Sequence, residues 1–265
     1  MQFASLGSGS EGNALVVCHG QSPSDRSGTQ GARALLIDCG FGLKEAQQRL
    51  ARLGLGAADL AGILVTHEHS DHVGGVFRLA RQASTPIFMT AGTLRGCQVP
   101  EACRGLIRVI DAHAPFDWCD WRIEPFPVPH DAHEPVQYVI DDGRSRLGVL
   151  TDLGHPTAHL SQVLCRLNAL VLETNHDAEM LSASHYPPSL RARISGQYGH
   201  LENQDAASIL SALDHSRLQV VVAAHLSRHN NRAALAQQAL AQVMGWRPQE
   251  VKVADQDLGL PWIAL

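Results

Sequence analysis

The chain has 265 residues, of which 45% are apolar and 18% charged, and its formal net charge is −5. This length allows one large domain or two small ones, and such a chain buries enough surface on folding to need no disulfide bonds. The acidic balance gives no global attraction to nucleic acid, although Arg191, Arg193 and Arg228 are candidates for a local basic patch.

The sequence also argues against export and membrane insertion. No apolar run reaches the roughly 18 residues that a membrane-spanning helix needs. The first residues lack the basic and apolar stretches of a secretory signal. The six cysteines form no CxxC pair, so we expect them to be reduced. We therefore predict a cytoplasmic protein that does not enter a membrane.

The first half of the chain alternates between predicted strands and helices. Two strands, 15–18 and 34–37, flank residues 20–33, which are rich in Gly, Ser and Gln and indicate an exposed loop. Hydrophobic periodicity then predicts a helix, a strand, a second helix and a further strand. These lie at 43–53, 61–65, 76–82 and 86–89.

The second half continues the same pattern. Strands are expected at 121–128, 138–140, 147–150, 169–172 and 220–224, and helices at 205–213 and 232–244. No internal repeat or composition break divides the chain. We therefore predict one layered α/β (α+β) domain over residues 1–265, with sheets inside and helices outside.

A dense group of metal-ligand residue types follows the strand at 61–65. Three imidazoles and two carboxylates occur within six residues, in the run His67-Glu68-His69-Ser70-Asp71-His72. At a strand end His67 and His69 can point the same way, because side chains repeat with period two. Neutral imidazole together with carboxylate suits zinc or a similar divalent ion. The plainer interpretation is a polar loop that happens to be rich in histidine.

Five other predicted strands also end at a polar side chain. These side chains are Asp38, His130, Asp152, Glu173 and His225. Rigid strand ends that open on a cleft are common positions for catalytic groups. Each residue alone also has a structural interpretation, such as a turn-forming Asp or a satisfied buried His. Their recurrence alongside the histidine cluster favours a shared site.

These motifs together resemble the metallo-β-lactamase-fold superfamily of metal-dependent hydrolases over nearly the whole chain. The resemblance implies an αββα four-layer sandwich with two metal ions at one edge. It implies that one ion is bound by His67, His69 and His130, and the other by Asp71, His72 and His225. It further implies that Asp152 bridges both ions and that Asp38 orients the ligands from behind.

The second half of the chain is similar to the YycJ or WalJ branch, which is related to tRNase Z. Leu172-Glu173-Thr174-Asn175-His176-Asp177, Gly199-His200-Leu201 and Ala224-His225-Leu226-Ser227-Arg228 carry this similarity. It implies 5′-3′ exonuclease activity on DNA. A hydroxide shared by the two ions would attack phosphorus, and a Glu173–His200 pair would protonate the leaving group. The catalytic candidates are Asp71, Glu173 and His200, and the substrate-contact candidates are His176, Arg228 and Asn231.

Three other functions stay open on the sequence. A tRNA 3′-processing endonuclease of this kind usually carries a long arm between its third and fourth motifs, and the 21 residues at 131–151 leave no room for one. A hydrolase of a small ester or cyclic phosphodiester shares the same histidine run. An inert binding protein would lose ligands, whereas all seven are present. The ligand types admit zinc, manganese or iron, and the expected partner is nucleic acid, DNA before RNA.

Overall fold

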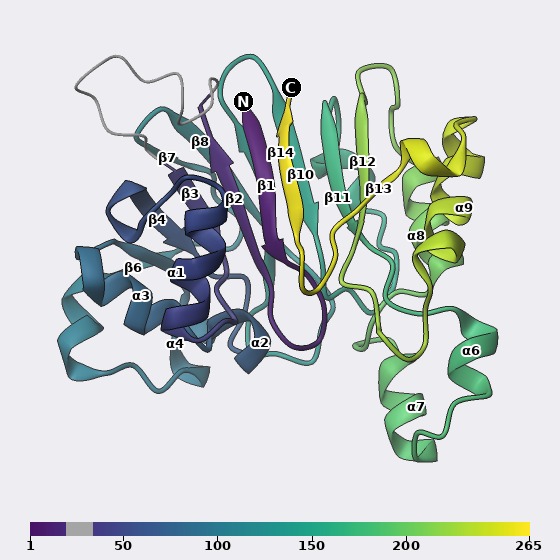
Figure 1. Cartoon of the computed structure of the whole chain (residues 1–265), viewed down its shortest axis with the longest axis horizontal. Helices are drawn as coiled ribbons and strands as arrows, with labels where there is room; N and C mark the ends of the chain where they lie inside the picture. Colours follow the sequence, from purple (N-terminus) through teal and green to yellow (C-terminus); the bar gives the residue numbers. More distant parts are fainter. Residues whose placement is uncertain (20–33) are drawn as a thin grey trace.

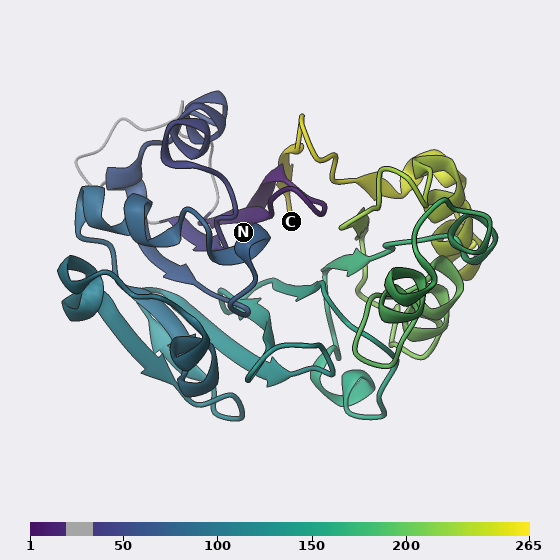
Figure 2. The same cartoon turned by 90° about the horizontal axis from the view of Figure 1, so that it is seen from below.

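A computed structural model describes residues 1–19 and 34–265 of the chain. The loop predicted at 20–33 lies outside the described residues. Within them, two seven-stranded mixed sheets pack face to face, with helices on the outer side of each (Figures 1 and 2). The described residues contain no helix of the length and apolarity needed to cross a bilayer.

The first sheet is built mainly from the N-terminal half of the chain, and the C-terminal strand completes it. Its order is β14-β1-β2-β3-β4-β5-β6, antiparallel from β14 to β3 and parallel from β3 to β6. The strands are β1 (Gln2–Gly7), β2 (Ala14–Cys18), β3 (Ala34–Ile37), β4 (Leu60–Leu64), β5 (Ile87–Thr90), β6 (Ile107–Ile110) and β14 (Leu260–Ala264).

The second sheet follows the order β13-β12-β11-β10-β9-β8-β7. Strands β10 to β13 run parallel, and β7 to β10 alternate in direction. The strands are β7 (Phe116–Trp118), β8 (Trp121–Pro127), β9 (Val136–Asp141), β10 (Arg146–Leu150), β11 (Ala169–Glu173), β12 (Val220–Ala224) and β13 (Lys252–Val253).

Helices cover the outer faces of both sheets, and short helical turns link the strands. The α-helices are α1 (Leu43–Arg52), α2 (Ser70–Val73), α3 (Val76–Ala83), α4 (Ala91–Gly96), α5 (Leu160–Val163), α6 (Ala178–Ser182), α7 (Pro188–Ile194), α8 (Asn203–Ser211) and α9 (Ala233–Met244). The 3₁₀ turns are η2 (Ala57–Asp59), η3 (Glu101–Leu106) and η4 (Pro248–Glu250). In Figure 1, α6 and α7 extend beyond the sheets on the side where α2 lies.

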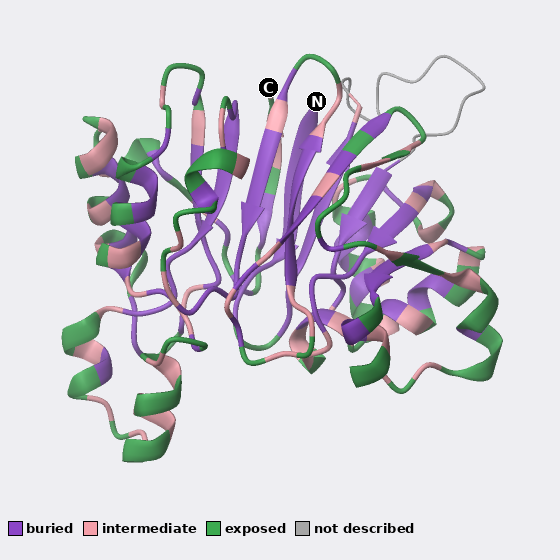
Figure 3. Cartoon of the chain, turned by 180° about the vertical axis from the view of Figure 1, so that it is seen from behind, coloured by how far each residue is buried: buried purple, intermediate pink, exposed green. Residues whose placement is uncertain are grey.

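Both faces of the central strands are buried, and this explains their continuous apolar runs. Along β3, Leu35 and Ile37 face the core between the two sheets, whereas Ala34 and Leu36 face the helices outside. The inner core also includes Tyr138 and other side chains from the second sheet. Figure 3 shows the buried strands between helices that expose one side. This shared core is the reason we propose a single domain over residues 1–265.

The strands and long helices expected from hydrophobic patterning are confirmed within the described residues, with ends that shift by one or two positions. Asp71 and His72 lie in the short helix α2, which hydrophobic patterning did not predict. Sequence patterns missed β1, β6, β7, β13 and β14, together with α4 to α7. The missed strands are short, lie near the ends of the sheets, or lack a clear apolar run.

Candidate metal centre

Three histidines from both sheets form the first cluster of ligand atoms. His67 and His69 follow β4 of the first sheet, whereas His130 follows β8 of the second. The Nδ1 atom of His69 lies 3.0 Å from His67 Nε2 and 3.3 Å from His130 Nε2. Three nitrogens bound tetrahedrally to one zinc ion would lie about 3.4 Å apart. The cluster therefore suits a divalent ion, which would tie the two sheets together.

The second nitrogen of each of these rings has a polar neighbour. His67 Nδ1 lies 3.0 Å from the Thr66 hydroxyl, and His130 Nδ1 lies 3.0 Å from the carbonyl oxygen of Gly199. His69 Nε2 lies 3.2 Å from the carbonyl oxygen of Asp131. Such contacts fix the ring orientation and leave the inner nitrogen free to bind a metal.

A second cluster lies beside the first and again joins both sheets. Asp71 and His72 belong to α2, and His225 directly follows β12. Oδ2 of Asp71 lies 3.5 Å from His72 Nε2 and 3.6 Å from His225 Nε2. Two imidazoles and a carboxylate at these distances also suit a divalent ion.

Asp152 lies between the two clusters. Its Oδ2 is 3.0 Å from His72 Nε2, and its Oδ1 is 3.9 Å from His130 Nε2. Nε2 of His225 is a buried atom without a hydrogen-bond partner. Buried polar atoms in proteins are nearly always satisfied, so this orphaned atom fits the role of a metal ligand.

Asp38 lies behind His72, on the side away from the cluster. One carboxylate oxygen accepts hydrogen bonds from His72 Nδ1 at 2.8 Å and from the Thr66 hydroxyl at 2.7 Å. The other accepts from the Thr66 backbone N–H at 2.8 Å. The carboxylate therefore fixes both a ring of the second cluster and the segment that carries the first.

Charge and burial divide the histidines into two electrostatic classes. Burial and neighbouring imidazoles hold the pKa of His67 well below its usual value, and burial also lowers the pKa of His130. Burial alone would lower the pKa of His225, but Asp152, Asp71 and Glu173 outweigh it and raise that pKa to about 10. Neutral His67 and His130 are ready to accept a metal, whereas a metal at His225 must displace a proton.

The buried Glu173 and the partly exposed His200 form a pair next to Asp152. His200 Nδ1 lies 2.9 Å from Glu173 Oε1 and 3.5 Å from Asp152 Oδ1. The same Glu173 oxygen lies 3.0 Å from His225 Nδ1, and its partner oxygen accepts from the Leu153 N–H at 2.7 Å. Burial would lower the pKa of His200, but the Glu173 carboxylate outweighs it and raises that pKa.

The three candidates for substrate contact are placed differently from what the sequence suggested. Asn231 is buried and donates to the carbonyl oxygen of Thr174 at 2.7 Å, so it is unavailable to a substrate. His176 is also buried, and burial lowers its pKa to about 4. Arg228 is partly exposed, but it pairs with Asp257 at 2.6 Å. Burial of Asn231 and His176 argues against direct substrate contact by either, and the role of all three residues stays a prediction.

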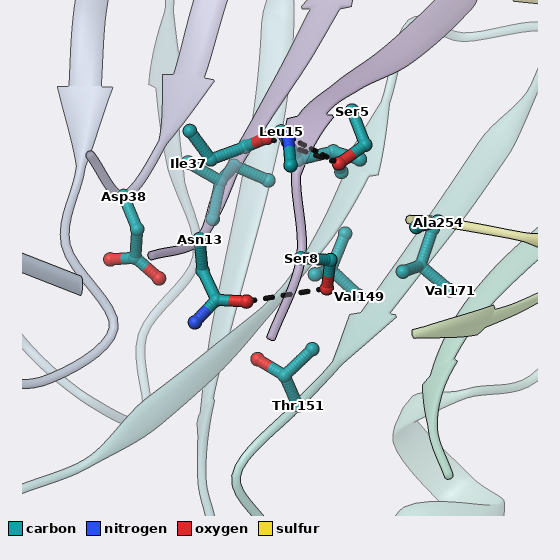
Figure 4. A pocket seen from close by; sticks show the side chains of 12 residues that line it. Ser5, Ser8, Asn13, Leu15, Ile37, Asp38, Val149, Thr151, Val171 and Ala254 are labelled. Atoms are coloured by element: carbon teal, nitrogen blue, oxygen red, sulfur yellow. Dashed lines mark hydrogen bonds between the residues drawn. The ribbon is translucent and has the colours of Figure 1, made fainter. Parts of the chain in front are cut away.

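Asn13 is a site neighbour that sequence reasoning missed. Its side-chain nitrogen lies 3.1 Å from His72 Nε2, and its oxygen accepts from the Ser8 hydroxyl at 3.2 Å. Ser8 Oγ in turn accepts a hydrogen bond from the backbone N–H of His225 at 2.9 Å. Figure 4 shows Ser8 and Asn13 beside a cavity of about 30 Å³ between the sheets, which Asp38 and Thr151 also line. Ser8 and Asn13 thus support the site through contacts that no ligand motif reveals.

Asp131 was missed in the same way. Its side chain accepts from Arg193 Nε at 2.8 Å, and its Oδ1 lies 3.4 Å from His130 Nε2. A carboxylate immediately after a predicted ligand was the available signal. The contact from Arg193 crosses 62 positions of sequence, so no local pattern indicated it.

The chain is similar to known proteins in sequence and in fold. A family model described as the β-lactamase superfamily domain matches residues 33–226. The exodeoxyribonuclease YycJ of Bacillus anthracis is 34% identical over 249 residues, which cover 92% of this chain and 89% of that protein.

Two solved structures share the fold. The metallo-β-lactamase fold protein YhfI from Bacillus subtilis has a TM-score of 0.72 at 15% identity, covering 99% of this chain and 98% of that one. Zn²⁺-bound PqqB from Methylobacterium extorquens has a TM-score of 0.73 at 16% identity, covering both chains fully. The chain therefore belongs to the metallo-β-lactamase superfamily of hydrolases, in the branch that contains YycJ.

Proposed function

We propose that this enzyme is a dinuclear metal-dependent phosphodiesterase that acts on nucleic acid, specifically as a 5′-3′ DNA exonuclease. The relative that is 34% identical over 92% of the chain is named an exodeoxyribonuclease, which supports a DNA substrate. The six free cysteines support action in a reducing compartment, the cytoplasm.

The clusters described above supply ligands for two ions. We assign one ion to His67, His69 and His130, the other to Asp71, His72 and His225, and Asp152 to both. Zinc and manganese both suit these donors. Two such ions, when bound, polarise a phosphodiester and activate a water molecule for attack on phosphorus. Asp38 and Thr66 hold the ligating rings in place.

The contact between Glu173 and His200 is the observation that carries the proposal. A departing nucleoside alkoxide needs a proton, and a protonated imidazole next to the ligands can supply it. Glu173 holds His200 by Nδ1 at 2.9 Å and favours its charged form. The bond at Nδ1 leaves Nε2 as the nitrogen that donates a proton to the leaving group.

The geometry favours this function over tRNA 3′ processing. Strands β9 and β10 and their connections occupy residues 131–151, between the third and fourth motifs. That stretch holds two strands of the second sheet and no projecting arm. The helices that do extend from the site edge, α6 and α7, come after the Glu173 strand (Figure 1).

The test uses the zinc- and manganese-loaded protein with end-labelled single- and double-stranded DNA and RNA, next to bis-p-nitrophenyl phosphate. We expect nucleotides to be released stepwise from the 5′ end of DNA. Cleavage of the small diester without cleavage of any polymer would assign the site to a small phosphodiester instead. Products cut at internal positions would contradict the exonuclease mode.

A further inference from the structure

An exposed aromatic residue, Tyr198, lies in the segment that leads directly into His200. Tyr198 is 59% exposed, and only Val109 and Leu258 join it as exposed large hydrophobic side chains within the described parts of the chain. Tyr198 stands two residues before His200 and next to Gly199, whose carbonyl oxygen contacts the His130 ring. Because this side chain is mostly exposed, its ring is free to stack on a ligand group that reaches this position.

The backbone at Tyr198 packs against the loops that follow His130 and Asp152. The carbonyl oxygen of Tyr198 accepts from the Asp131 N–H at 3.1 Å. A Cβ atom at Gly154 would lie 2.0 Å from the carbonyl oxygen of Gln197, so this segment packs directly on the loop that follows Asp152. These contacts hold the backbone of Tyr198 next to the loops that follow His130 and Asp152.

A guanidinium group is anchored to the same residue, Asp131. Arg193, at the end of α7, donates through Nε to Asp131 at 2.8 Å and is 61% exposed. This bond uses only one of the five N–H groups of the guanidinium, and the rest are available for phosphate oxygens. Arg191, by contrast, donates to the carbonyl oxygen of Ser182 and thereby ties α7 to α6.

We propose that Tyr198 and Arg193 form an end-binding platform, on which the 5′-terminal base of the DNA strand stacks on Tyr198 while Arg193 contacts the neighbouring phosphate. This inference rests on the proposed nuclease function and names how that site holds its substrate. Aromatic rings bind any base through its face, and arginine binds the backbone, so the platform is independent of sequence. That property suits an enzyme that removes successive nucleotides.

The decisive experiment alters the ring and the base separately. Wild type and Tyr198→Ala are compared on two single-stranded DNA substrates of equal length, one intact and one whose 5′-terminal nucleotides lack bases. We expect wild type to prefer the intact substrate by about tenfold in kcat/KM, mainly through KM. Tyr198→Ala should lose that preference because its binding partner is gone. Tyr198→Phe and the remote control Val109→Ala should keep it.

The outcomes separate the platform from the nuclease function. If Tyr198→Ala keeps the wild-type preference, or loses activity equally on both substrates, base stacking on Tyr198 is contradicted. The proposed nuclease function is unaffected by either result. If wild type cleaves neither oligonucleotide, the nuclease function is contradicted, and so is the end-binding platform that rests on it.

The arginine half of the platform has its own readout. Arg193→Gln should lower the dependence of log KM on log salt concentration by about one unit, whereas Arg193→Lys should keep it. Metal content is measured in parallel, because Arg193 also contacts Asp131. Loss of metal in Arg193→Gln with an unchanged salt slope would make Arg193 a support for the ligand loop and would overturn its phosphate contact.

Discussion

Three residues of the site adopt a backbone conformation that few side chains tolerate. Asp38, Asp152 and His225 have φ values of 60°, 52° and 56°, in the left-handed region. Such strain costs roughly 1–3 kcal/mol at each residue and persists where the surroundings impose it. Each residue follows closely on a buried strand, so the turn of the chain directs its side chain into the site. Ligand geometry is thus obtained at the expense of local backbone stability.

Asp152 combines this strained backbone conformation with a proposed role in binding both metal ions. We expect both Asp152→Ala and Asp152→Asn to lose the paired metals and the activity, since neither side chain supplies an anionic oxygen to both clusters. Elemental analysis of metal content and the turnover of a small diester measure these two losses. The metal-free Asn variant should be the more stable of the two, because Asn tolerates the left-handed region better than Ala. Retention of both metals by the Asn variant would contradict the bridging role.

His200 allows proton donation to be separated from metal binding. His200→Ala should retain its metals and reduce kcat by about 10²- to 10⁴-fold, the usual contribution of a general acid. The exposed His113 provides the control, since His113→Ala should change neither quantity. A loss of metal in His200→Ala would instead make that residue part of the ligand set.

At the scale of single elements, α2 depends on a close backbone approach. A Cβ atom at Gly40 would lie 1.9 Å from the carbonyl oxygen of Asp71, so only glycine fits between the loop after β3 and α2. The same oxygen accepts from the Asn13 N–H at 2.8 Å. Asn13 and the loop after β3 thereby fix the position of Asp71 and His72, the candidate ligands on α2.

Gly40→Ala should therefore displace α2 and weaken metal binding at Asp71 and His72 more than at the triple-histidine cluster. Nearby Gly42 is the matched control, because a Cβ there would meet nothing within 4 Å. Metal titration of the two variants, followed calorimetrically, measures this difference. Equal metal affinities in Gly40→Ala and Gly42→Ala would show that α2 is not held by this contact.

Sequence patterns could predict those elements whose signal is local. Buried strands such as β12 have continuous apolar runs, and ligands such as His225 follow them directly. The outer strand β6 is only half-buried, so its pattern carries little information. The contacts of Asn13 and Asp131 join segments that are far apart in the chain, and left-handed turns at Asp and His have no distinct sequence signature. These features emerge only when the two sheets meet.

At the scale of the whole molecule, the two clusters of candidate metal ligands join the two sheets. Each cluster takes ligands from the first sheet's edge, through β4 or α2, and from the second sheet's edge, through β8 or β12. The sheets also share one apolar core. A single domain with this core should unfold in one cooperative transition, and bound metal should raise the transition temperature because it binds only the assembled edge.

The increase in melting temperature that bound metal causes should grow as the pH rises. The pKa of His225 is raised from 6.5 to about 10 in the metal-free fold. Its proton therefore stabilises that fold fully below pH 6.5, and this contribution is lost as pH rises toward 10. A metal must displace the same proton, so binding strengthens over the same range. The difference in melting temperature between metal-loaded and chelated protein should thus widen with rising pH, as measured by scanning calorimetry. In His225→Gln, this difference in melting temperature should depend less on pH. A difference that narrows with rising pH in the unaltered protein would contradict the assignment of His225 as a ligand.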